Sequence, residues 1–236
     1  MNGKTVSQKN SGNLIMNIPL FADLSNEEVE LIEGIIVKKN FVKDQIVLLE
    51  EETANCMYIV YAGKVRVVKQ STEGREQILT IHKKNECFGE LSLLDGKTSP
   101  ATVIAHEDAV IGLLSKNDFE QLLLDHEVIR NKIITLLCTS LRESWTMIKI
   151  LSFDNAEQRI LAALDRMQQL YGLVDGRGVI VNVRLTHQQI ANFASVTRET
   201  VTRVLKRLEN DAVIQILDGK KILLTASFYE RVKADS

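Results

Sequence analysis

Two short amphipathic stretches meet at a tight turn between residues 185 and 209, which read LTHQQIANFASVTRETVTRVLKRLE. Thr186 with Gln189 three positions later forms a capping box that starts the first helix, and Thr197 is an N-cap for the second. Ser195 falls in the turn, where we expect a left-handed backbone that serine adopts at a cost. The sequence therefore predicts a helix-turn-helix. Its apolar positions recur at helical spacing: Ile190, Ala191, Ala194, Val201, Val204, Leu205 and Leu208.

The second helix of this motif carries polar residues on the face opposite its apolar stripe. Arg198, Glu199, Thr202 and Arg203 lie there, on its first turns. Arginine donates two parallel hydrogen bonds to O6 and N7 of guanine, and glutamate accepts from N4 of cytosine. These side chains therefore suit base readout in a major groove. The competing interpretation is an ordinary solvated first turn in which the helix dipole favours Glu199.

The run RETVTRVLKRLE, followed by a short apolar hairpin, resembles the DNA-binding domain of the CRP/FNR family of bacterial transcription regulators. The resemblance implies that the two arginines and the glutamate contact bases of a TGTGA-like half-site, and that His187 and Gln188 contact phosphate. Thr202 stands where members of the family differ, which leaves the outer bases of the half-site open. The expected DNA-binding residues are Arg198, Glu199, Thr202, Arg203, His187, Gln188 and Thr197.

Charge is unevenly distributed along the chain. The net charge of −2 argues against a general nucleic-acid coat, yet five cations face one carboxylate, Glu199, between positions 184 and 207. A locally basic element on an acidic body suits a protein that finds DNA electrostatically and discriminates by contacts. Lys220 and Lys221, at the tip of the hairpin IQILDGKKILLT, either touch phosphate or are simply solvated. The five cations are Arg184, Arg198, Arg203, Lys206 and Arg207.

The composition is that of an ordinary globular protein with room for two domains: 236 residues, 45% hydrophobic and 25% charged. No apolar run has the length of a membrane span, and the N-terminus lacks the apolar core of a signal peptide. We therefore expect a cytoplasmic bacterial protein with no membrane partner.

The three cysteines provide no framework for a metal or a disulfide. Cys56, Cys87 and Cys138 are spread through the chain without CxxC spacing, and we expect each to be a buried small apolar residue. The clustered N-terminal cysteines with which the FNR branch holds an iron–sulfur cluster are missing, so no such cluster is expected. No metal-ligand cluster, Walker loop or nucleophile with a base is present, which argues against an enzyme.

The remaining periodicities predict an α+β chain in several parts. Residues 1–13 are polar and predicted to be disordered, and a helix capped by Ser25 and Glu28 follows. Many short β-branched runs between residues 40 and 114 indicate a jelly-roll-like β-roll. The predicted parts are a β-roll sensor domain at 14–126, a dimerisation helix at 127–152, a hinge at 153–155 and a winged helix-turn-helix domain at 156–236.

Within the β-roll, FGELSLLDGKTSPATV resembles the phosphate-binding cassette of cyclic-nucleotide-binding domains. Backbone N–H groups of the turn around Gly89 are expected to cradle an anion, and in the family the residue matching Glu90 accepts from a ribose hydroxyl. Family members that bind cyclic nucleotides continue with Arg-Ser-Ala, whereas this chain has Ser99-Pro100-Ala101. Losing that arginine costs about 3–5 kcal/mol, so we expect cyclic AMP not to be the effector. The expected effector-binding residues are Gly89, Glu90, Leu91, Ser92, Ser99 and Ser144.

Three interpretations of the cassette remain open. It is scaffold only, it binds another small effector, or the same cavity holds haem, for which His82 and Cys87 are the candidate ligands. A lone histidine and a lone cysteine are more often structural, so haem is the least favoured. The cofactor is therefore unknown.

The long helix expected at 127–152 carries apolar residues at intervals of seven. This pattern predicts a coiled-coil seam, although a helix buried in the chain's own core is the competing interpretation. The family resemblance favours a homodimer, and it implies that the hydroxyl of Ser144 approaches the effector. Asp154, within the hinge, and Glu157 are expected to cap the next helix. The expected dimerisation residues are Ile134, Leu137, Leu141, Ile148 and Leu151.

Together, these patterns and the family resemblance predict a homodimeric, sequence-specific transcription regulator that reads a palindromic site, and the resemblance implies that this site is TGTGA-like. We expect it to activate transcription, with RNA polymerase as a partner and a small effector other than cyclic AMP as its signal. The alternatives are a regulator of the same family that needs no effector, and a haem-based gas sensor.

Overall fold

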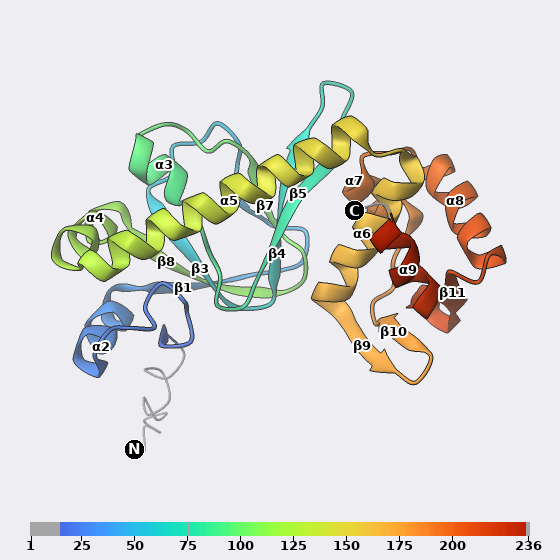
Figure 1. The fold of residues 1–236 in the computed structure, drawn as a ribbon. Coiled ribbons are helices and arrows are strands. Elements are labelled where there is room, and N and C mark those ends of the chain that lie inside the picture. The colour runs from blue at the N-terminus through green and yellow to red at the C-terminus, as the bar shows by residue number, and fades with distance from the viewer. Residues whose placement is uncertain (1–14, 75, 235–236) are drawn as a thin grey trace, which may run out of the picture. The chain divides into compact units, whose positions relative to one another are not determined.

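The computed structural model describes residues 15–74 and 76–234, so the predicted disordered segment 1–13 lies outside the described residues. The chain forms two compact units (Figure 1). The first contains the residues up to Lys69 and from Ile78 to Leu141, and the second contains Gln70–Gln77 and the residues from Arg142 on. The predicted α+β class is confirmed, with a β-rich first unit, a long helix and a helix-turn-helix in the second unit.

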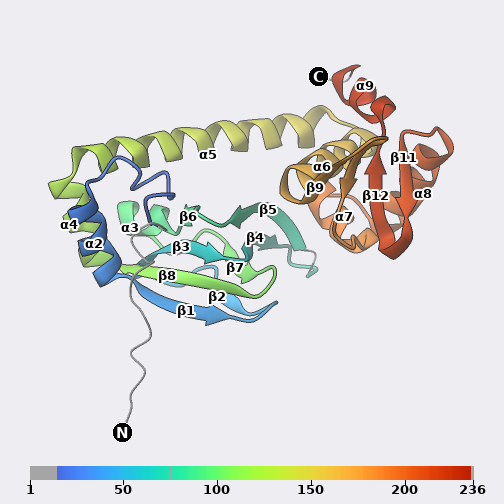
Figure 2. The ribbon, with the colours of Figure 1, turned by 90° about the horizontal axis from the view of Figure 1, so that it is seen from below.

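The first unit is built on two four-stranded antiparallel sheets, in the orders β1-β8-β3-β6 and β2-β7-β4-β5 (Figure 2). Its strands are β1 (Val37–Phe41), β2 (Ile46–Leu48), β3 (Cys56–Ala62), β4 (Lys64–Gln70), β5 (Glu76–Lys83), β6 (Cys87–Phe88), β7 (Thr102–Ala105) and β8 (Ala109–Ser115). Its helices are α2 (Asn26–Ile35), α3 (Glu90–Asp95), α4 (Lys116–Asp125) and the first part of α5 (Glu127–Phe153).

Strand β3 separates the two cores of this unit. Because successive side chains of a strand point to opposite faces, Met57 and Ile59 pack into the cluster that contains residues of α2, α4 and α5. Tyr58 and Val60 point the other way, into the cluster between the sheets. Both faces of β3 are therefore buried, which explains why its sequence is a continuous apolar run rather than an alternating one.

Local sequence signals set the ends of these elements. Ser25 and Glu28 form the predicted capping box of α2, with the Ser25 amide 2.8 Å from the Glu28 carboxylate. Gly63 turns the chain between β3 and β4 at a φ of 76°, and a Cβ there would lie 2.2 Å from the carbonyl oxygen of Asp108. Glycine is therefore required at this turn both by the backbone angle and by the lack of space.

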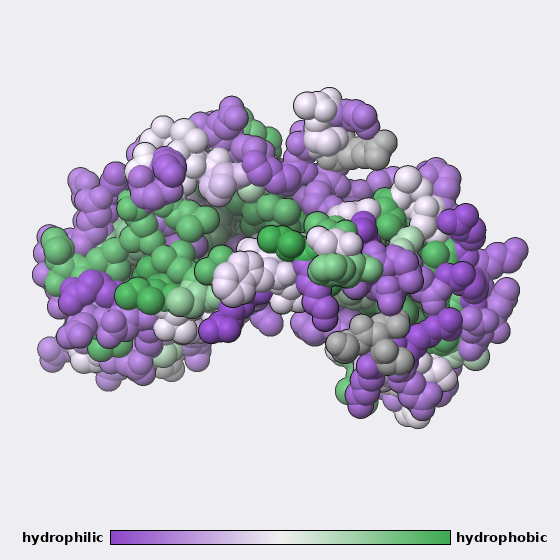
Figure 3. Space-filling model, turned by 45° about the horizontal axis from the view of Figure 1, so that its top comes forward, coloured by the Kyte–Doolittle hydropathy of each residue, from purple (hydrophilic) through white to green (hydrophobic). Residues whose placement is uncertain are grey.

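Helix α5 exposes an apolar face along most of its length. Ile134, Leu141 and Ile148 recur at intervals of seven residues and are 57%, 52% and 60% exposed. Leu137, which we expected beside them in the seam, instead packs partly buried against the core of the first unit. Figure 3 shows hydrophobic residues gathered on this side of the molecule.

The three cysteines differ in burial. Cys87 is buried and Cys56 is half-buried, whereas Cys138 is exposed on α5, so the expectation that every cysteine is buried is wrong for Cys138.

Within the second unit, α5 ends at Phe153, one residue later than expected, and two residues separate it from the next helix. Its sheet has the order β11-β12-β10-β9, from β9 (Gly172–Asp175), β10 (Gly178–Val181), β11 (Ile214–Leu217) and β12 (Lys221–Leu224). Its helices are α6 (Ala156–Tyr171), α7 (His187–Ala194), α8 (Arg198–Asn210), the short 3-10 turn η1 (Asp218–Lys220) and α9 (Ala226–Ala234).

The cap of α6 differs by one residue from the prediction. Asn155 is the N-cap rather than Asp154, and its side-chain oxygen accepts from the amides of Glu157 and Gln158, at 2.9 and 3.1 Å. The Gln158 side chain accepts in return from the Asn155 amide, at 2.8 Å. This reciprocal box satisfies three backbone N–H donors at the start of the helix. Among the described residues, no helix has the length and apolarity needed to cross a membrane.

Candidate nucleic-acid interface

The caps of the helix-turn-helix form as predicted. Thr186 and Gln189 make the capping box of α7, and the Thr197 hydroxyl accepts from the amide of Thr200 at 3.2 Å to start α8. Ser195 between the helices has φ 53° and ψ 44°, the left-handed conformation that we expected. The turn is therefore built from residue preferences that can be read in the sequence, with one strained position.

Helix α8 separates its apolar and polar residues onto opposite faces. Val201, Val204, Leu205 and Leu208 are buried, and they fix the helix in its unit. Four residues that we expected at the DNA interface are exposed on the other side: Arg198, Glu199, Thr202 and Arg203. The structure thus leaves two arginines and a glutamate at the start of the helix, where recognition helices contact base edges.

The hydroxyl of Thr202 is already engaged within the motif. It donates to the carbonyl oxygen of Arg198, at 3.0 Å, and lies 2.8 Å from Nδ1 of His187 on α7. His187 and Thr202 are fifteen positions apart, so this contact joins the first turn of α7 to the middle of α8. Since the single hydroxyl proton is used, Thr202 presents chiefly its methyl group to a partner.

Gln188, the other residue expected at phosphate, is exposed on α7. Its amide nitrogen donates to the side-chain oxygen of Asn192, one turn later, at 2.8 Å. An amide nitrogen has two hydrogens, so one of them remains for a further acceptor. Thr197, by contrast, uses its hydroxyl on the helix start.

One of the five cations that the sequence places on this face has its charge neutralised by the fold. Arg207 forms an ion pair with Glu157 of α6, and the same carboxylate binds Arg231 of α9 at 3.1 Å. Arg231 also reaches Asp211 at 3.2 Å. Arg207 is one of the five cations that make this segment basic in sequence, and in the fold its charge is paired with Glu157. The pairing spans fifty positions of sequence, so no local pattern reveals it.

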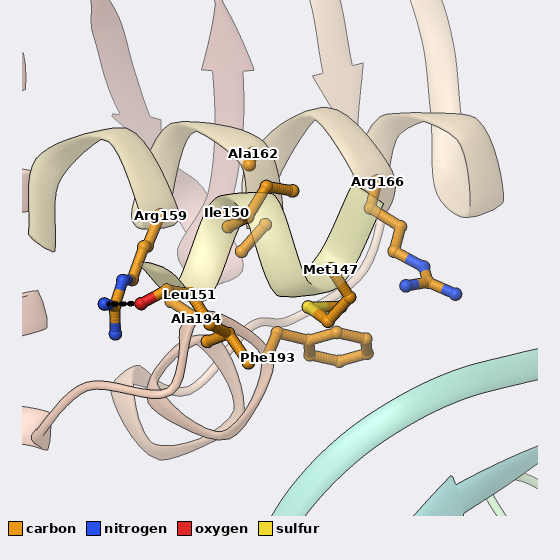
Figure 4. A pocket seen from close by; sticks show the side chains of 9 residues that line it. Met147, Ile150, Leu151, Arg159, Ala162, Arg166, Phe193 and Ala194 are labelled. Carbon is orange, nitrogen blue, oxygen red and sulfur yellow. Dashed lines mark hydrogen bonds between the residues drawn. The ribbon is translucent and has the colours of Figure 1, made fainter. Parts of the chain in front are cut away.

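A further arginine fixes the chain between α5 and α6. Arg159 donates to the carbonyl oxygen of Leu151 at 2.6 Å (Figure 4). It also donates to the carbonyl oxygen of Asp154 at 3.1 Å. Carbonyl groups at the end of a helix have no partner within it, so a guanidinium there satisfies two that would otherwise be open. These two hydrogen bonds were not predicted from the sequence. The one signal for them in the sequence is that Arg159 comes one turn after the break between the helices.

The wing of the motif ends at the turn Asp218–Lys220. Gly219 and Lys220 both have positive φ, 73° and 61°. Lys220 is exposed and Lys221 half-buried, so the first is better placed for a phosphate. The carbonyl oxygen of Lys220 accepts from the amide of Leu185 at 3.4 Å, which ties the wing to the segment ahead of α7.

In the first unit, the cassette loop closes against the protein's own aromatic rings. Gly89 has φ 87°, and a Cβ on it would lie 2.8 Å from the ring of Tyr58. Tyr58 stacks on Phe88 with ring centroids 5.0 Å apart, and Phe88 stacks on His82 at 5.4 Å. Glu90 is buried, and burial is the main cause that raises the pKa of its carboxyl. A buried carboxyl of raised pKa is a hydrogen-bond donor over a wider pH range than an exposed one.

The other residues expected to bind an effector differ in burial and in their hydrogen bonds. Ser92 is buried, whereas Leu91 is exposed. The hydroxyl of Ser99 donates to the carbonyl oxygen of Ala101 at 2.8 Å, and its backbone bonds Glu51 and Glu52. Ser99 is thus held by the chain itself, which removes it from the set of free donors. Ser144 is exposed on the part of α5 that belongs to the second unit, so its role beside the cassette stays a prediction.

The two candidate haem ligands are both engaged in the first unit. His82 stacks on Phe88 and lies 3.5 Å from the carboxylate of Glu86. Burial, and then the charges of Glu90 and Glu86, raise the pKa of the Cys87 thiol, which disfavours the thiolate that binds a metal. Within residues 15–74 and 76–234, no group of three or more histidine, cysteine or carboxylate side chains has the arrangement of a metal site.

Comparison with known proteins places both units in known families. The cyclic nucleotide-binding domain matches residues 38–126, and the Crp-like helix-turn-helix domain matches residues 158–226. The cyclic AMP receptor protein of Thermus thermophilus is 29% identical over 214 residues, which are 91% of this chain and 96% of that protein. The CRP-like cAMP-activated global transcriptional regulator of Mycobacterium tuberculosis is 30% identical over 190 residues, which are 80% of this chain and 84% of that one.

The fold of the chain is also similar to that of a solved structure. The structure of FixK2 from Bradyrhizobium japonicum superposes with a TM-score of 0.72 at 22% identity, covering 85% of this chain and 96% of that one. The relatives are transcription regulators rather than enzymes, and the exposed arginines and glutamate of α8 lie in the DNA-binding part that this chain shares with them. The chain belongs to the CRP/FNR family of transcription regulators, and it is a DNA-binding regulator.

Proposed function

We propose that this regulator binds a palindromic TGTGA-like site as a homodimer, with one α8 helix in each of two successive major grooves. The observation that carries the proposal is the arrangement of α8, whose apolar face is buried while Arg198, Glu199 and Arg203 are exposed at its N-terminal end. A two-fold dimer presents the same residues twice, which requires a site with matching symmetry.

Footprinting on a duplex with two inverted TGTGA-type half-sites tests the base contacts. Arg203→Ala should abolish the footprint and relax specificity at one base pair, because a bidentate contact contributes about 1–3 kcal/mol per half-site. Lys206→Ala is the matched control, since Lys206 is exposed on the same helix but is expected to act only through its charge. It should weaken binding to all sequences alike. Equal footprints for Arg203→Ala and the unaltered protein would disprove the assignment.

The exposed face of α5 is the proposed dimer seam. Its apolar residues Ile134, Leu141 and Ile148 repeat every seven positions, and a large exposed apolar surface is costly for a protein that stays single. Leu141→Glu should therefore yield a monomer in sedimentation at micromolar concentration. Thr139→Glu is the control, because Thr139 is exposed on α5 but lies off this seven-residue repeat, and it should leave the dimer intact. A monomeric unaltered protein would refute the seam.

We further propose that the signal is a small effector other than cyclic AMP, although two relatives carry cyclic AMP in their names. The support is the sequence Ser99-Pro100-Ala101 where binders have Arg-Ser-Ala, together with the Ser99 hydroxyl held by Ala101. A thermal-shift titration should show no stabilisation by cyclic AMP. A ligand at a hundred times its Kd stabilises a protein by about 2.7 kcal/mol, which such a titration detects.

A second candidate is a regulator that needs no effector. It is favoured by Gly89, whose small size is already required by the chain's own Tyr58. The two candidates differ in one observable, because an effector-independent protein footprints the palindrome at full affinity when purified free of small molecules.

We infer activation of transcription, with RNA polymerase as the partner, from the family resemblance. Run-off transcription from a promoter that carries the palindrome measures this directly.

A further inference from the structure

The contact between α7 and α8 indicates which ring nitrogen of His187 carries a hydrogen. Thr202 Oγ1 lies 3.0 Å from the carbonyl oxygen of Arg198 and 2.8 Å from Nδ1 of His187. A carbonyl oxygen only accepts, so the single proton of the Thr202 hydroxyl goes to Arg198. Thr202 Oγ1 then accepts from His187, which means that Nδ1 of the ring carries a hydrogen.

This assignment determines what the other ring nitrogen offers. A neutral imidazole has one N–H, and because it lies on Nδ1, Nε2 has a lone pair and only accepts. The oxygens of a DNA phosphate also only accept. A neutral His187 in this arrangement therefore cannot donate to a phosphate, whereas a second proton makes Nε2 a charged donor.

We propose that DNA binding by this protein takes up a proton at His187, and that only the doubly protonated ring contacts a phosphate. The proposal rests on the proposed function, which supplies the phosphate. It adds to that function a dependence of DNA affinity on pH. Histidine changes its charge between about pH 5 and 8, whereas an arginine or lysine at the same place would stay charged. A dimer takes up to two protons, one at each half-site.

The charged groups on the elements next to His187 are mostly cations. On α7 itself the remaining residues are uncharged, and α6 packs on the other end of that helix, where Arg159 and Arg166 lie beside Phe193. A bound phosphate would bring negative charge to the ring and so favour its doubly protonated form. The groups on the adjoining segments are Arg184, Arg198, Glu199, Arg203, Lys206 and Lys220.

The sign of the pH dependence follows from the proton balance. The complex holds more protons than the free protein and free DNA, so affinity is highest at low pH and falls as the pH rises. The loss is at most about tenfold per pH unit for each protomer. The chain has four histidines, and His82, His106 and His126 belong to the first unit, so His187 is the one that lies in the DNA-binding unit.

The test is the Kd for the palindrome from about pH 5.5 to 8.5 at constant salt. The unaltered protein should lose affinity as the pH rises, and His187→Arg, which donates at every pH, should bind with little pH dependence. Thr202→Val removes the acceptor of Nδ1, so the neutral ring is free to carry its hydrogen on Nε2. This variant should bind with a shallower pH slope, while Thr202→Ser, which keeps the hydroxyl but lacks the methyl group, should keep the pH slope of the unaltered protein at whatever affinity it has.

A second measurement does not involve DNA. Imidazole 15N shifts of the full chain, with His187→Arg to assign the signal, should show hydrogen on Nδ1 of neutral His187. Hydrogen on Nε2, or equal pH slopes for the unaltered protein and His187→Arg, would overturn the inference even if both bind the palindrome. Failure of the unaltered protein to prefer the palindrome at any pH would instead overturn the proposed function.

Discussion

The carboxylate of Glu157, in the first turn of α6, forms an ion pair with the guanidinium of Arg207 near the end of α8. The Glu157 side chain is 15% exposed and also binds Arg231, so a single carboxylate ties α8 and α9 to α6. The helix that presents Arg198 and Arg203 is therefore held from its far end by charge as well as by its apolar stripe.

Replacing Glu157 by glutamine should lower the stability of the second unit by about 1–2 kcal/mol, because a partly buried carboxylate with two arginine partners is lost while the shape is kept. A calorimetric scan would show this as a Tm lower by about 2–4 °C per kcal/mol. Asp211→Asn removes only an exposed contact with Arg231 and should change the Tm little. Equal effects of the two variants would contradict the role of Glu157.

Arg159→Met should loosen the end of α5. The two carbonyl groups that it satisfies, those of Leu151 and Asp154, become open, at a cost of about 1–2 kcal/mol. Amide hydrogen exchange around residues 151–155 should then be about tenfold faster, since 1.4 kcal/mol corresponds to a factor of ten. Lys149→Met, an exposed cation on the preceding turn, should leave the exchange rates unchanged.

Ala212→Gly should stabilise the second unit. Ala212 follows α8 with a φ of 56°, and a left-handed residue with a Cβ costs roughly 1 kcal/mol more than glycine. The same substitution at Ala226, the first residue of α9, gains nothing of this kind and should be neutral or destabilising. Urea unfolding of both variants measures the difference, and a destabilised Ala212→Gly would contradict it.

The stability of the first unit should depend on pH through Glu90. Burial raises the pKa of this carboxyl in the folded protein, so the folded state holds the proton to a higher pH than the unfolded chain does. The stabilisation is present at low pH and is lost as the pH rises through the folded-state pKa. Glu90→Gln should therefore be more stable than the unaltered protein at neutral pH, and the difference should shrink towards acid pH. A difference that grows in acid would contradict this.

Local signals in the sequence predicted much of the DNA-binding unit, and long-range contacts explain most of the errors. The capping box at Thr186 and Gln189 and the left-handed Ser195 could be predicted because each depends on residues within one turn. The pairing of Arg207 with Glu157 and the bond between His187 and Thr202 could not, since they join separate helices.

In the first unit the composition of the strands predicted the β-roll, but not the details of the cassette. The continuous apolar run of β3 indicates burial, yet only the fold brings the ring of Tyr58 beside Gly89. The engagement of Ser99 with Ala101 likewise depends on a loop conformation that its polarity does not specify. Cys138 was expected inside because free cysteines usually are buried, whereas α5 turns this position outward.

The most direct test of the account is the dependence of DNA affinity on half-site spacing. Insertion of about 5 base pairs between the two inverted half-sites turns them by half a helical turn, so that a rigid pair of α8 helices can no longer reach both. We predict that the protein binds the unaltered palindrome far more tightly than the lengthened one, whose affinity falls to that of a single half-site. Equal Kd values for the two duplexes would contradict the paired recognition helices.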